Sequence, residues 1–414
     1  MHITIVTIGS RGDVEPYLAL GKGLLLAGHT VRLSTHDRFR PEIREAGLEF
    51  SPITGDPRQL VEEEAGKRWL ESGRNPVRIM RRLLDVSGPF FSQLLQDCET
   101  AMAGTGAVLF SVLAFPAYHL AEASRIPAVA AYLQPMTRTR ELPSMFVKAG
   151  GPGFWNLWSH VAAEQITWQP LRREVNRWRR SLGLGPLPVS GLYRPVYRSM
   201  PVLYGFSPAV VPPPTDWPAL VKVTGYWFPA VGDNRRPPER VTQFLDDGPA
   251  PVYVGFGSRP ERRPQELADL VLAAVRQAGR RAILLTGWGG LTVPDSSDDV
   301  LVVDEIRHDW LFPQMSAVVH HGGAGTTGTA LQSGIPSIVV PSFADQFFWG
   351  ERVAALGVGL NLPRRKLIPE SLAGAITATS DPAMGRRAVD LGVKLRAENG
   401  VRRAVDELTS IFNL

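Results

Sequence analysis

The feature that most constrains the fold is an alternation of short apolar strands with helices, which occurs twice along the chain of 414 residues. The first run covers residues 3–133 and the second covers residues 251–342. Such alternation predicts parallel sheets of the doubly wound kind. Between the runs lie helical sequence rich in Trp and Arg at 137–205 and proline-rich stretches at 210–218 and 232–240. We therefore expect two Rossmann-like domains joined by a proline-rich link.

The expected boundaries divide the chain into four parts. They are an N-terminal Rossmann-like domain at 1–213, a linker at 214–240, a C-terminal Rossmann-like domain at 241–388 and a final helix at 389–414, within a long charged helical pattern at 384–412. In the first domain we expect Pro16 at the start of a helix and Gly28 and Gly47 at helix ends. A cleft between the carboxyl ends of the two sheets is expected to hold the ligands.

Composition excludes several classes of protein. Hydrophobic residues make up 44% and charged residues 21%, as in an ordinary globular protein. The single cysteine, Cys98, allows no internal disulfide and is typical of a reducing cytoplasm. The start, "MHITIVTIGSRGD", indicates a strand rather than a signal peptide, and no stretch approaches the roughly 20 apolar residues of a membrane span. A net charge of +5 does not indicate a nucleic-acid partner. We expect a soluble, cytoplasmic protein.

Basic residues gather in two segments with apolar residues between them. These are Arg78, Arg81 and Arg82 in one segment and Arg172, Arg173, Arg177, Arg179 and Arg180 in the other. Both patterns are typical of amphipathic surface helices. They indicate either solvated helix faces or peripheral contact with an anionic membrane surface.

The stretch "AVVHHGGAGTTGTALQSG" at 317–334 passes from an apolar strand through glycines into a helix. A metal, a dinucleotide or another diphosphate could require this arrangement. Because adjacent strand residues face opposite sides, His320 and His321 do not share a metal easily, and no third ligand stands at a zinc spacing. A phosphate-binding P-loop would need a lysine that is absent here.

The run from Gly323 to Gly328 does fit the dinucleotide pattern G-x-G-x-x-G. That fingerprint belongs in the first strand–helix unit of a domain, and its acidic partner should end the next strand, which Asp345 does not. A diphosphate therefore remains the favoured ligand, bound by backbone N–H groups at a helix N-terminus. In the next loop, Asp345 and Gln346 could bind sugar hydroxyls, the alternative for Asp345 being a helix N-cap.

The stretch from 320 to 360, "HHGGAGTTGTALQSGIPSIVVPSFADQFFWGERVAALGVGL", resembles the donor-binding motif of family 1 glycosyltransferases. It is most similar to the sterol glucosyltransferases, and next to the glycosyltransferases of antibiotic aglycones. "TIGSRGDVEPYLALGKGLLLAGHTVRLSTHDRF", "LQPMTRTRELPS" and "RHDWLFPQMSAVVHHGGAGTT" carry the same resemblance, which covers nearly the whole chain.

The resemblance implies the GT-B fold, with the acceptor on the first domain, the nucleotide sugar on the second, and a final helix that returns to the first. It also implies roles for named residues. They are His321, Gly323, Gly325, Thr326, Thr327 and Ser258 for the donor diphosphate, Asp345 and Gln346 for the donor sugar, Val303, Ile306 and Arg307 for the base and ribose, and Gln134, Met136, Trp155 and Trp158 for the acceptor pocket. For Trp155 and Trp158 the pocket is suggested by the aromatic run at 137–205 itself, and the alternative, which is commoner for tryptophans at helical spacing, is that they fill a core.

Transfer of a sugar to a hydroxyl requires a base, and Asp13 follows the first strand in "SRGDVEP". The alternative for Asp13 is an N-cap, and the resemblance favours the base. The expected activity is inverting, metal-independent transfer of a hexose, expected to be glucose, from a UDP-sugar to a sterol-like or other lipophilic small molecule. Alternatives are a TDP- or UDP-sugar glycosyltransferase of a polyketide or peptide natural product, a non-catalytic nucleotide-sugar sensor, and an NAD-dependent dehydrogenase, which is the least favoured.

Overall fold

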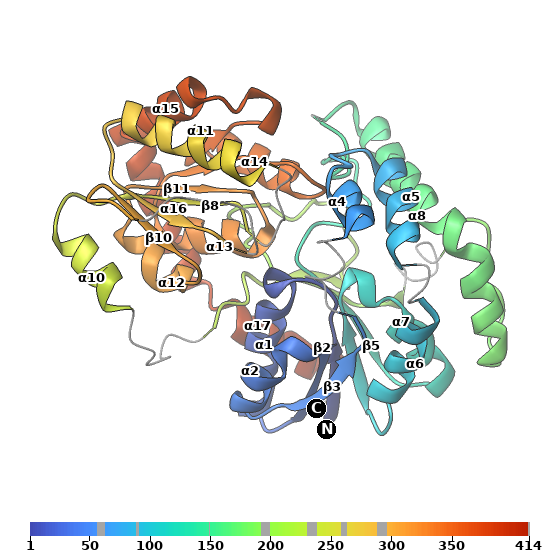
Figure 1. Cartoon of the computed structure of the whole chain (residues 1–414). Helices are drawn as coiled ribbons and strands as arrows, with labels where there is room; N and C mark the ends of the chain where they lie inside the picture. The colour runs from blue at the N-terminus through green and yellow to red at the C-terminus, as the bar shows by residue number, and fades with distance from the viewer. Residues whose placement is uncertain are drawn as a thin grey trace. The chain divides into compact units, whose positions relative to one another are not determined.

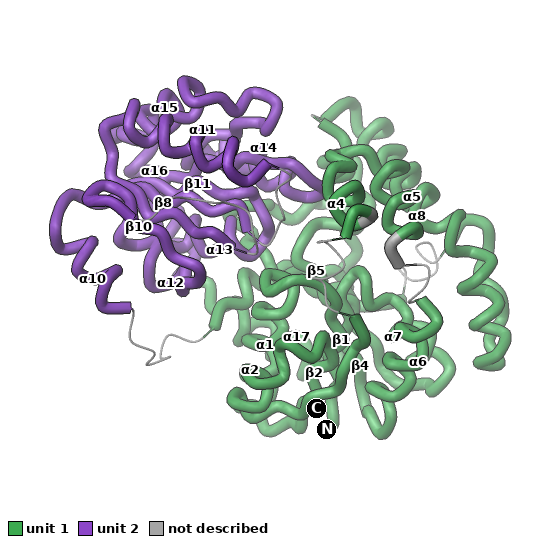
Figure 2. The backbone as a smooth tube through the Cα atoms, in the orientation of Figure 1, with its two compact units in different colours: residues 1–229, 398–414 green, residues 230–397 purple. Residues whose placement is uncertain are grey.

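The computed structural model of the protein describes residues 1–55, 63–87, 91–148, 150–191, 199–229, 238–257, 263–287 and 296–412. The chain forms two compact units, shown in Figure 2. Unit 1 comprises residues 1–229 and 398–414, and unit 2 comprises residues 230–397. Each unit is built on its own parallel sheet, as Figure 1 shows.

Unit 1 has seven strands in its described residues, paired in parallel in the order β3-β2-β1-β4-β5-β6-β7. The strands are β1 (His2–Val6), β2 (Thr30–His36), β3 (Glu49–Ile53), β4 (Ala107–Phe110), β5 (Ala128–Tyr132), β6 (Val202–Tyr204) and β7 (Val221–Val223). The helices are α1 (Arg11–Leu26), η1 (Asp37–Phe39), α2 (Arg40–Glu45), α4 (Glu64–Leu70), α5 (Pro76–Ser87), α6 (Phe91–Ala101), η3 (Val112–Ala114), α7 (Pro116–Ser124), α8 (Gly153–Ser181) and α17 (Gly400–Ile411). Helices α1, α2 and α17 lie on one side of the sheet, and α6 and α7 on the other (Figure 1).

Unit 2 repeats the same plan with the strand order β10-β9-β8-β11-β12-β13. Its strands are β8 (Val252–Gly255), β9 (Ala282–Leu285), β10 (Val300–Val303), β11 (Ala317–His320), β12 (Ser337–Val339) and β13 (Gly359–Asn361). Its helices are α10 (Glu239–Asp246), α11 (Pro264–Gln277), α12 (His308–Leu311), η4 (Phe312–Gln314), α13 (Ala324–Ser333), α14 (Gln346–Ala355), η5 (Arg364–Lys366), α15 (Pro369–Ala378) and α16 (Pro382–Ala397).

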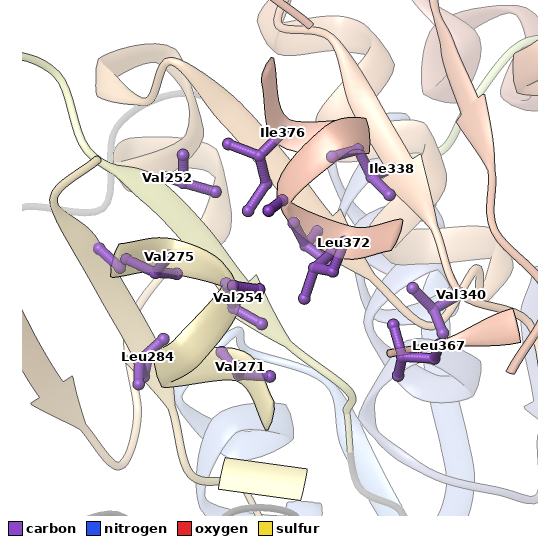
Figure 3. Close-up of a cluster of buried hydrophobic side chains, with 14 of the residues drawn as sticks. Val252, Val254, Val271, Val275, Leu284, Ile338, Val340, Leu367, Leu372 and Ile376 are labelled. Atoms are coloured by element: carbon purple, nitrogen blue, oxygen red, sulfur yellow. The ribbon is translucent and has the colours of Figure 1, made fainter. Parts of the chain in front are cut away.

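One face of the second sheet packs against α11 and α15, as Figure 3 shows. Val271 and Val275 come from α11, and Leu372 and Ile376 from α15; all are nearly or fully buried. The strands of this sheet are buried on both faces, because helices also cover the other face. This is why the strands appear in the sequence as continuous apolar runs. The expectation of two doubly wound, Rossmann-like units is confirmed.

The start of the first helix differs from the sequence expectation. Helix α1 begins at Arg11, and Pro16 lies inside it. The reason is a capping box, in which the Ser10 N–H donates to Asp13 Oδ2 at 2.9 Å and fixes the helix start upstream of the proline. Pro16 then costs one intrahelical hydrogen bond. Gly28 and Gly47 follow helix ends with positive φ, as expected.

The boundaries between the units also differ from the expected ones at 213 and 388. Strand β7 extends the first sheet beyond 213, and a three-residue strand gives too short a pattern to predict. The charged pattern at 384–412 is two helices, α16 in unit 2 and α17 in unit 1, separated at Asn399, which has φ +48°. Helix α17 packs closely on α1, where a Cβ at Gly23 would lie 2.4 Å from Val401 Cγ1. The expected return of the final helix to the first domain is confirmed.

No helix in the described parts of the chain combines the length and the apolar character needed to cross a bilayer.

Candidate functional site

The strand order places the candidate residues at the switch point of each sheet. The order reverses between β1 and β4 in unit 1 and between β8 and β11 in unit 2. Ligands of doubly wound folds bind outside the carboxyl ends of the strands at these points. Asp13 follows β1, and His321 and Gly323 follow β11, so both switch points carry residues that the sequence singled out.

The ring of His321 is enclosed by backbone at the end of two neighbouring strands. A Cβ at Gly257, which follows β8, would lie 2.6 Å from His321 Cε1, and a Cβ at Gly323 would lie 2.6 Å from Nε2. Gly257 also has a φ of +74°, which side-chain-bearing residues rarely adopt. The glycines at both positions therefore let the imidazole pack against the chain itself. The role of Gly257 was missed in the sequence, where the pattern "GFG" after a strand was the available signal.

The two adjacent histidines have different surroundings. His320 is fully buried in β11, and its Nδ1 accepts a hydrogen bond from the Gly322 N–H at 3.1 Å. Burial, together with His321 and His308, lowers the pKa of His320 to about 3, so its ring stays neutral. His320 therefore shapes the turn, whereas His321 is partly exposed at the end of the strand.

Helix α13 starts directly after this turn, with Gly323 in the N-cap position and no side chain that caps it. The N–H groups of a first helical turn have no partner within the helix, and its dipole attracts an anion by about 0.3–2 kcal/mol. Gly323, Gly325 and Thr326 lie at this start as expected. Thr327 differs, because its N–H donates to the Gly323 carbonyl at 2.9 Å and its side chain is fully buried. Ser258, also expected at the diphosphate, lies outside the described residues.

The loop after β12 holds the pair expected at the donor sugar. Asp345 takes the N-cap position of α14 without capping it, and its Oδ2 accepts a hydrogen bond from Trp349 Nε1 at 3.0 Å. Gln346 Oε1 accepts hydrogen bonds from the Ser342 N–H at 3.0 Å and the Phe343 N–H at 3.1 Å. The side-chain oxygen of Gln346 thus stabilises the loop that precedes α14, and its side-chain nitrogen, Nε2, is the atom that can donate a hydrogen bond to a ligand. Trp349, which orients Asp345, was not anticipated.

The segment expected at the nucleotide base follows β10. Val303 is buried in the core, Ile306 packs against the same core, and Arg307 forms an ion pair with Asp309. Val303 therefore offers backbone rather than side chain to a ligand. Arg307 is also the N-cap residue of α12.

Asp13 is the third residue of α1, and both Ser10 N–H and Ser10 Oγ donate to its Oδ2, at 2.9 and 3.0 Å. This geometry holds the carboxyl in one orientation at the carboxyl end of β1. The Gly9 N–H donates to His36 Nε2 at 3.2 Å, which ties the same loop to the end of β2. Desolvation by the surrounding protein raises the pKa of Asp13, although the hydrogen bonds from Ser10 oppose this shift.

The residues expected in an acceptor pocket fall into two groups. Gln134 and Met136 are partly buried after β5, and the Met136 N–H donates to the Tyr204 hydroxyl at 2.9 Å. Trp155 and Trp158 lie on α8, and each side chain is 61% exposed. The described residues do not enclose these two tryptophans.

Two family models match the chain. The N-terminal domain of glycosyltransferase family 28 matches residues 3–143, and the C-terminal domain of erythromycin biosynthesis protein CIII-like proteins matches residues 290–410.

Among solved structures, the glycosyltransferase of kitacinnamycin has a TM-score of 0.73 at 22% identity, with 99% of each chain covered. The calicheamicin glycosyltransferase CalG4 has a TM-score of 0.69 at 18% identity, with 100% of this chain and 98% of that chain covered. These similarities establish the fold.

Sterol 3-beta-glucosyltransferases are similar over the full chain. The one from Arabidopsis thaliana is 37% identical over 98% of this chain and 67% of its own length. The one from Emericella nidulans is 37% identical over 99% of this chain, which spans 30% of that longer protein. The one from Neurospora crassa is 39% identical over 99% of this chain, which spans 27% of that protein. The chain therefore belongs to the sterol glucosyltransferase family of GT-B glycosyltransferases.

Proposed function

We propose that the protein transfers a hexose, in the first instance glucose, from a UDP-sugar to the hydroxyl of a sterol or a similar lipophilic molecule. The observation that carries this proposal is the His321 ring, held between Gly257 and Gly323 at the start of α13. An imidazole ring and a helix N-terminus at a switch point suit a diphosphate. The identity to the Arabidopsis sterol 3-beta-glucosyltransferase supports the acceptor class.

In the proposed reaction, the acceptor hydroxyl gives its proton to the Asp13 carboxylate as its oxygen attacks the anomeric carbon. The bond from that carbon to the diphosphate oxygen breaks, and UDP leaves. Asp13 suits a general base because the Ser10 hydrogen bonds orient it and its raised pKa makes it a stronger base than an ordinary aspartate. Attack from the face opposite the diphosphate inverts the anomeric centre.

The leaving diphosphate gains one negative charge, on the oxygen that was bound to the sugar, and this charge must be stabilised. We assign this role to His321 and to the first-turn N–H groups of α13, which are fixed before the reaction and need not reorganise. With these groups the transfer needs no metal. Asp345 and Gln346 are assigned to the hydroxyls of the donor sugar, with Trp349 positioning Asp345.

The proposal places the protein in the cytoplasm, in peripheral contact with a membrane surface from which a lipophilic acceptor can be drawn. The basic segments in α5 and α8 support such contact.

The test is an incubation with UDP-glucose and a sterol in the presence of a chelator, analysed by mass spectrometry. A sterol glucoside is expected with the wild-type protein and none above background with Asp13→Asn. Binding of UDP-glucose without any glucoside would contradict the sterol acceptor, and turnover of TDP-sugars alone would contradict the donor. Loss of all turnover on chelation, restored by a divalent cation, would contradict metal independence.

A further inference from the structure

Helix α8 carries a long outward face that no other described element covers. The exposed residues of this face recur at helical spacing from Trp155 to Arg180, a rise of about 38 Å at 1.5 Å per residue. They are Trp155, Trp158, Ala162, Gln169, Arg173, Arg177 and Arg180. We call this set the outer face of α8. Residues three, four and seven apart share one side of a helix, so these side chains point the same way.

The opposite side of α8 is anchored in unit 1. Trp168 and Val175 are buried in a cluster with Phe91 and Leu95 of α6. Arg179, which the sequence grouped with the surface arginines, is buried instead and forms an ion pair with Glu122 of α7. Figure 1 shows α8 along the outer edge of unit 1, beside α5. The outer face is therefore held firmly in place.

The first turns of α8 form an apolar end of this face. Phe154, Trp155 and Trp158 are the exposed Phe and Trp side chains of the described residues, at 56%, 61% and 61%. Val147 is also exposed, and its backbone carbonyl accepts a hydrogen bond from the Arg74 side chain at 2.6 Å. Arg74 stands three residues before Val77 of α5, which is exposed as well. Exposed apolar side chains thus occur in the first turns of α8 and on two further segments that this hydrogen bond links to each other, and exposed apolar surface of this kind indicates a contact site.

The last turns of α8 form a basic end. Arg173, Arg177 and Arg180 are exposed on the outer face, and Glu174 is the exposed carboxylate beside them. Arg78 of α5 and Lys148, which are neighbours in sequence of the exposed Val77 and Val147, are exposed as well. A rigid helix with aromatic side chains at one end and arginines at the other matches the interface of an anionic bilayer, in which rings enter the headgroup region and guanidinium groups bind phosphates.

We propose that the outer face of α8 docks the protein on a bilayer that contains anionic lipids. The inference rests on the proposed function, because a membrane is where a sterol-like acceptor resides. Trp155 and Trp158 enter the headgroup region, and Arg173, Arg177 and Arg180 bind lipid phosphates. In this arrangement the two tryptophans contact lipid rather than line a closed acceptor pocket.

The test is co-sedimentation of the full chain with vesicles of phosphatidylcholine alone or with phosphatidylglycerol added. Binding is expected to need the anionic lipid and to weaken with salt. Trp155→Ser with Trp158→Ser should reduce binding at least tenfold. Arg173→Gln with Arg177→Gln and Arg180→Gln should reduce it roughly fivefold per arginine. The matched control is Val389→Ser with Val393→Ser, two similarly exposed positions on α16, which should bind as the wild type does.

Equal binding by all variants, or equal binding to neutral vesicles, would overturn the proposal. Concentration-dependent dimerisation that only the tryptophan variant abolishes would assign the face to a second copy and overturn it as well. Turnover of a detergent-solubilised sterol separates the two proposals, since the arginine variant should keep that activity while losing vesicle binding. If no variant has turnover but vesicle binding follows the pattern above, the proposed function fails and the docking surface stands.

Discussion

Replacement of Gly323 by alanine tests the donor-site geometry with a single added methyl group. The new Cβ would lie 2.6 Å from His321 Nε2, where ordinary contacts begin at 3.4 Å. The backbone of Gly323 has φ −61° and ψ 146°, which alanine adopts without strain, so the ring must move by nearly an ångström. Because a hydrogen bond to a charged group contributes about 1.5–3 kcal/mol, loss of the His321 contact should raise the Kd for UDP roughly ten- to 150-fold.

The assay is isothermal titration with UDP and, in parallel, with uridine. Since the methyl group acts at the diphosphate, uridine binding should change little. Gly374→Ala is the matched control, because Gly374 lies within α15 and a Cβ there meets nothing within 4 Å. That control should bind UDP normally and unfold at an equal or higher temperature. Unchanged UDP affinity in Gly323→Ala, or an equal loss for UDP and uridine, would refute the assignment of His321 to the diphosphate.

Three further predictions concern Asp13, Asp345 and Cys98. Asp13→Asn should lower kcat by about 10²–10⁴-fold without changing UDP affinity. Desolvation is the main reason that the pKa of Asp13 is raised above its ordinary 3.8, so the loss of wild-type kcat/KM on acidification should have its midpoint above pH 3.8. A midpoint at or below pH 3.8 would contradict the base assignment. The raised pKa also means that the folded state binds the proton of the Asp13 carboxyl group more tightly than the unfolded state does. The contribution of Asp13 to the free energy of unfolding therefore declines as pH rises from the ordinary pKa to the raised one. Trp349→Phe removes the donor to Asp345 Oδ2 and should raise KM for UDP-glucose about tenfold while leaving the Kd for UDP unchanged; equal changes in both would contradict a role at the sugar. Burial, with Asp97 and Glu99, raises the pKa of Cys98 to about 12, so iodoacetamide at pH 8 should label the thiol only after denaturation, and rapid labelling of native protein would show that the thiol is accessible.

The sequence predicted the parts of the fold that depend on local pattern. Strands buried on both faces appear as apolar runs, so β8, β11 and their neighbours were recognisable, and the glycines at 28 and 47 marked helix ends. The start of α1 was not predicted, since the capping box at Ser10 and Asp13 overrides the preference of Pro16 for a first turn. The separation of α16 from α17 was hidden, because the charged helical pattern continues through Asn399.

The candidate site was predictable as a set of residue types but not as a set of contacts. The glycine turn and Asp345–Gln346 stand in recognisable motifs. By contrast, the close packing of Gly257 on the His321 ring and the hydrogen bond from Trp349 to Asp345 arise only in the folded structure. Thr327 also stands in the motif, and the sequence could not show that its side chain would be fully buried in the structure. A pattern fixes spacing along the chain, and the direction of each side chain depends on packing.

The most direct measurement of the central claim is the anomeric configuration of the sugar in the product, read by proton NMR of the glucoside formed from UDP-glucose. The donor is α-linked, so a single displacement with Asp13 as base predicts a β-glucoside. An α-glucoside would contradict direct attack by the acceptor. Absence of any glycoside with a sterol acceptor would contradict the proposed transfer itself.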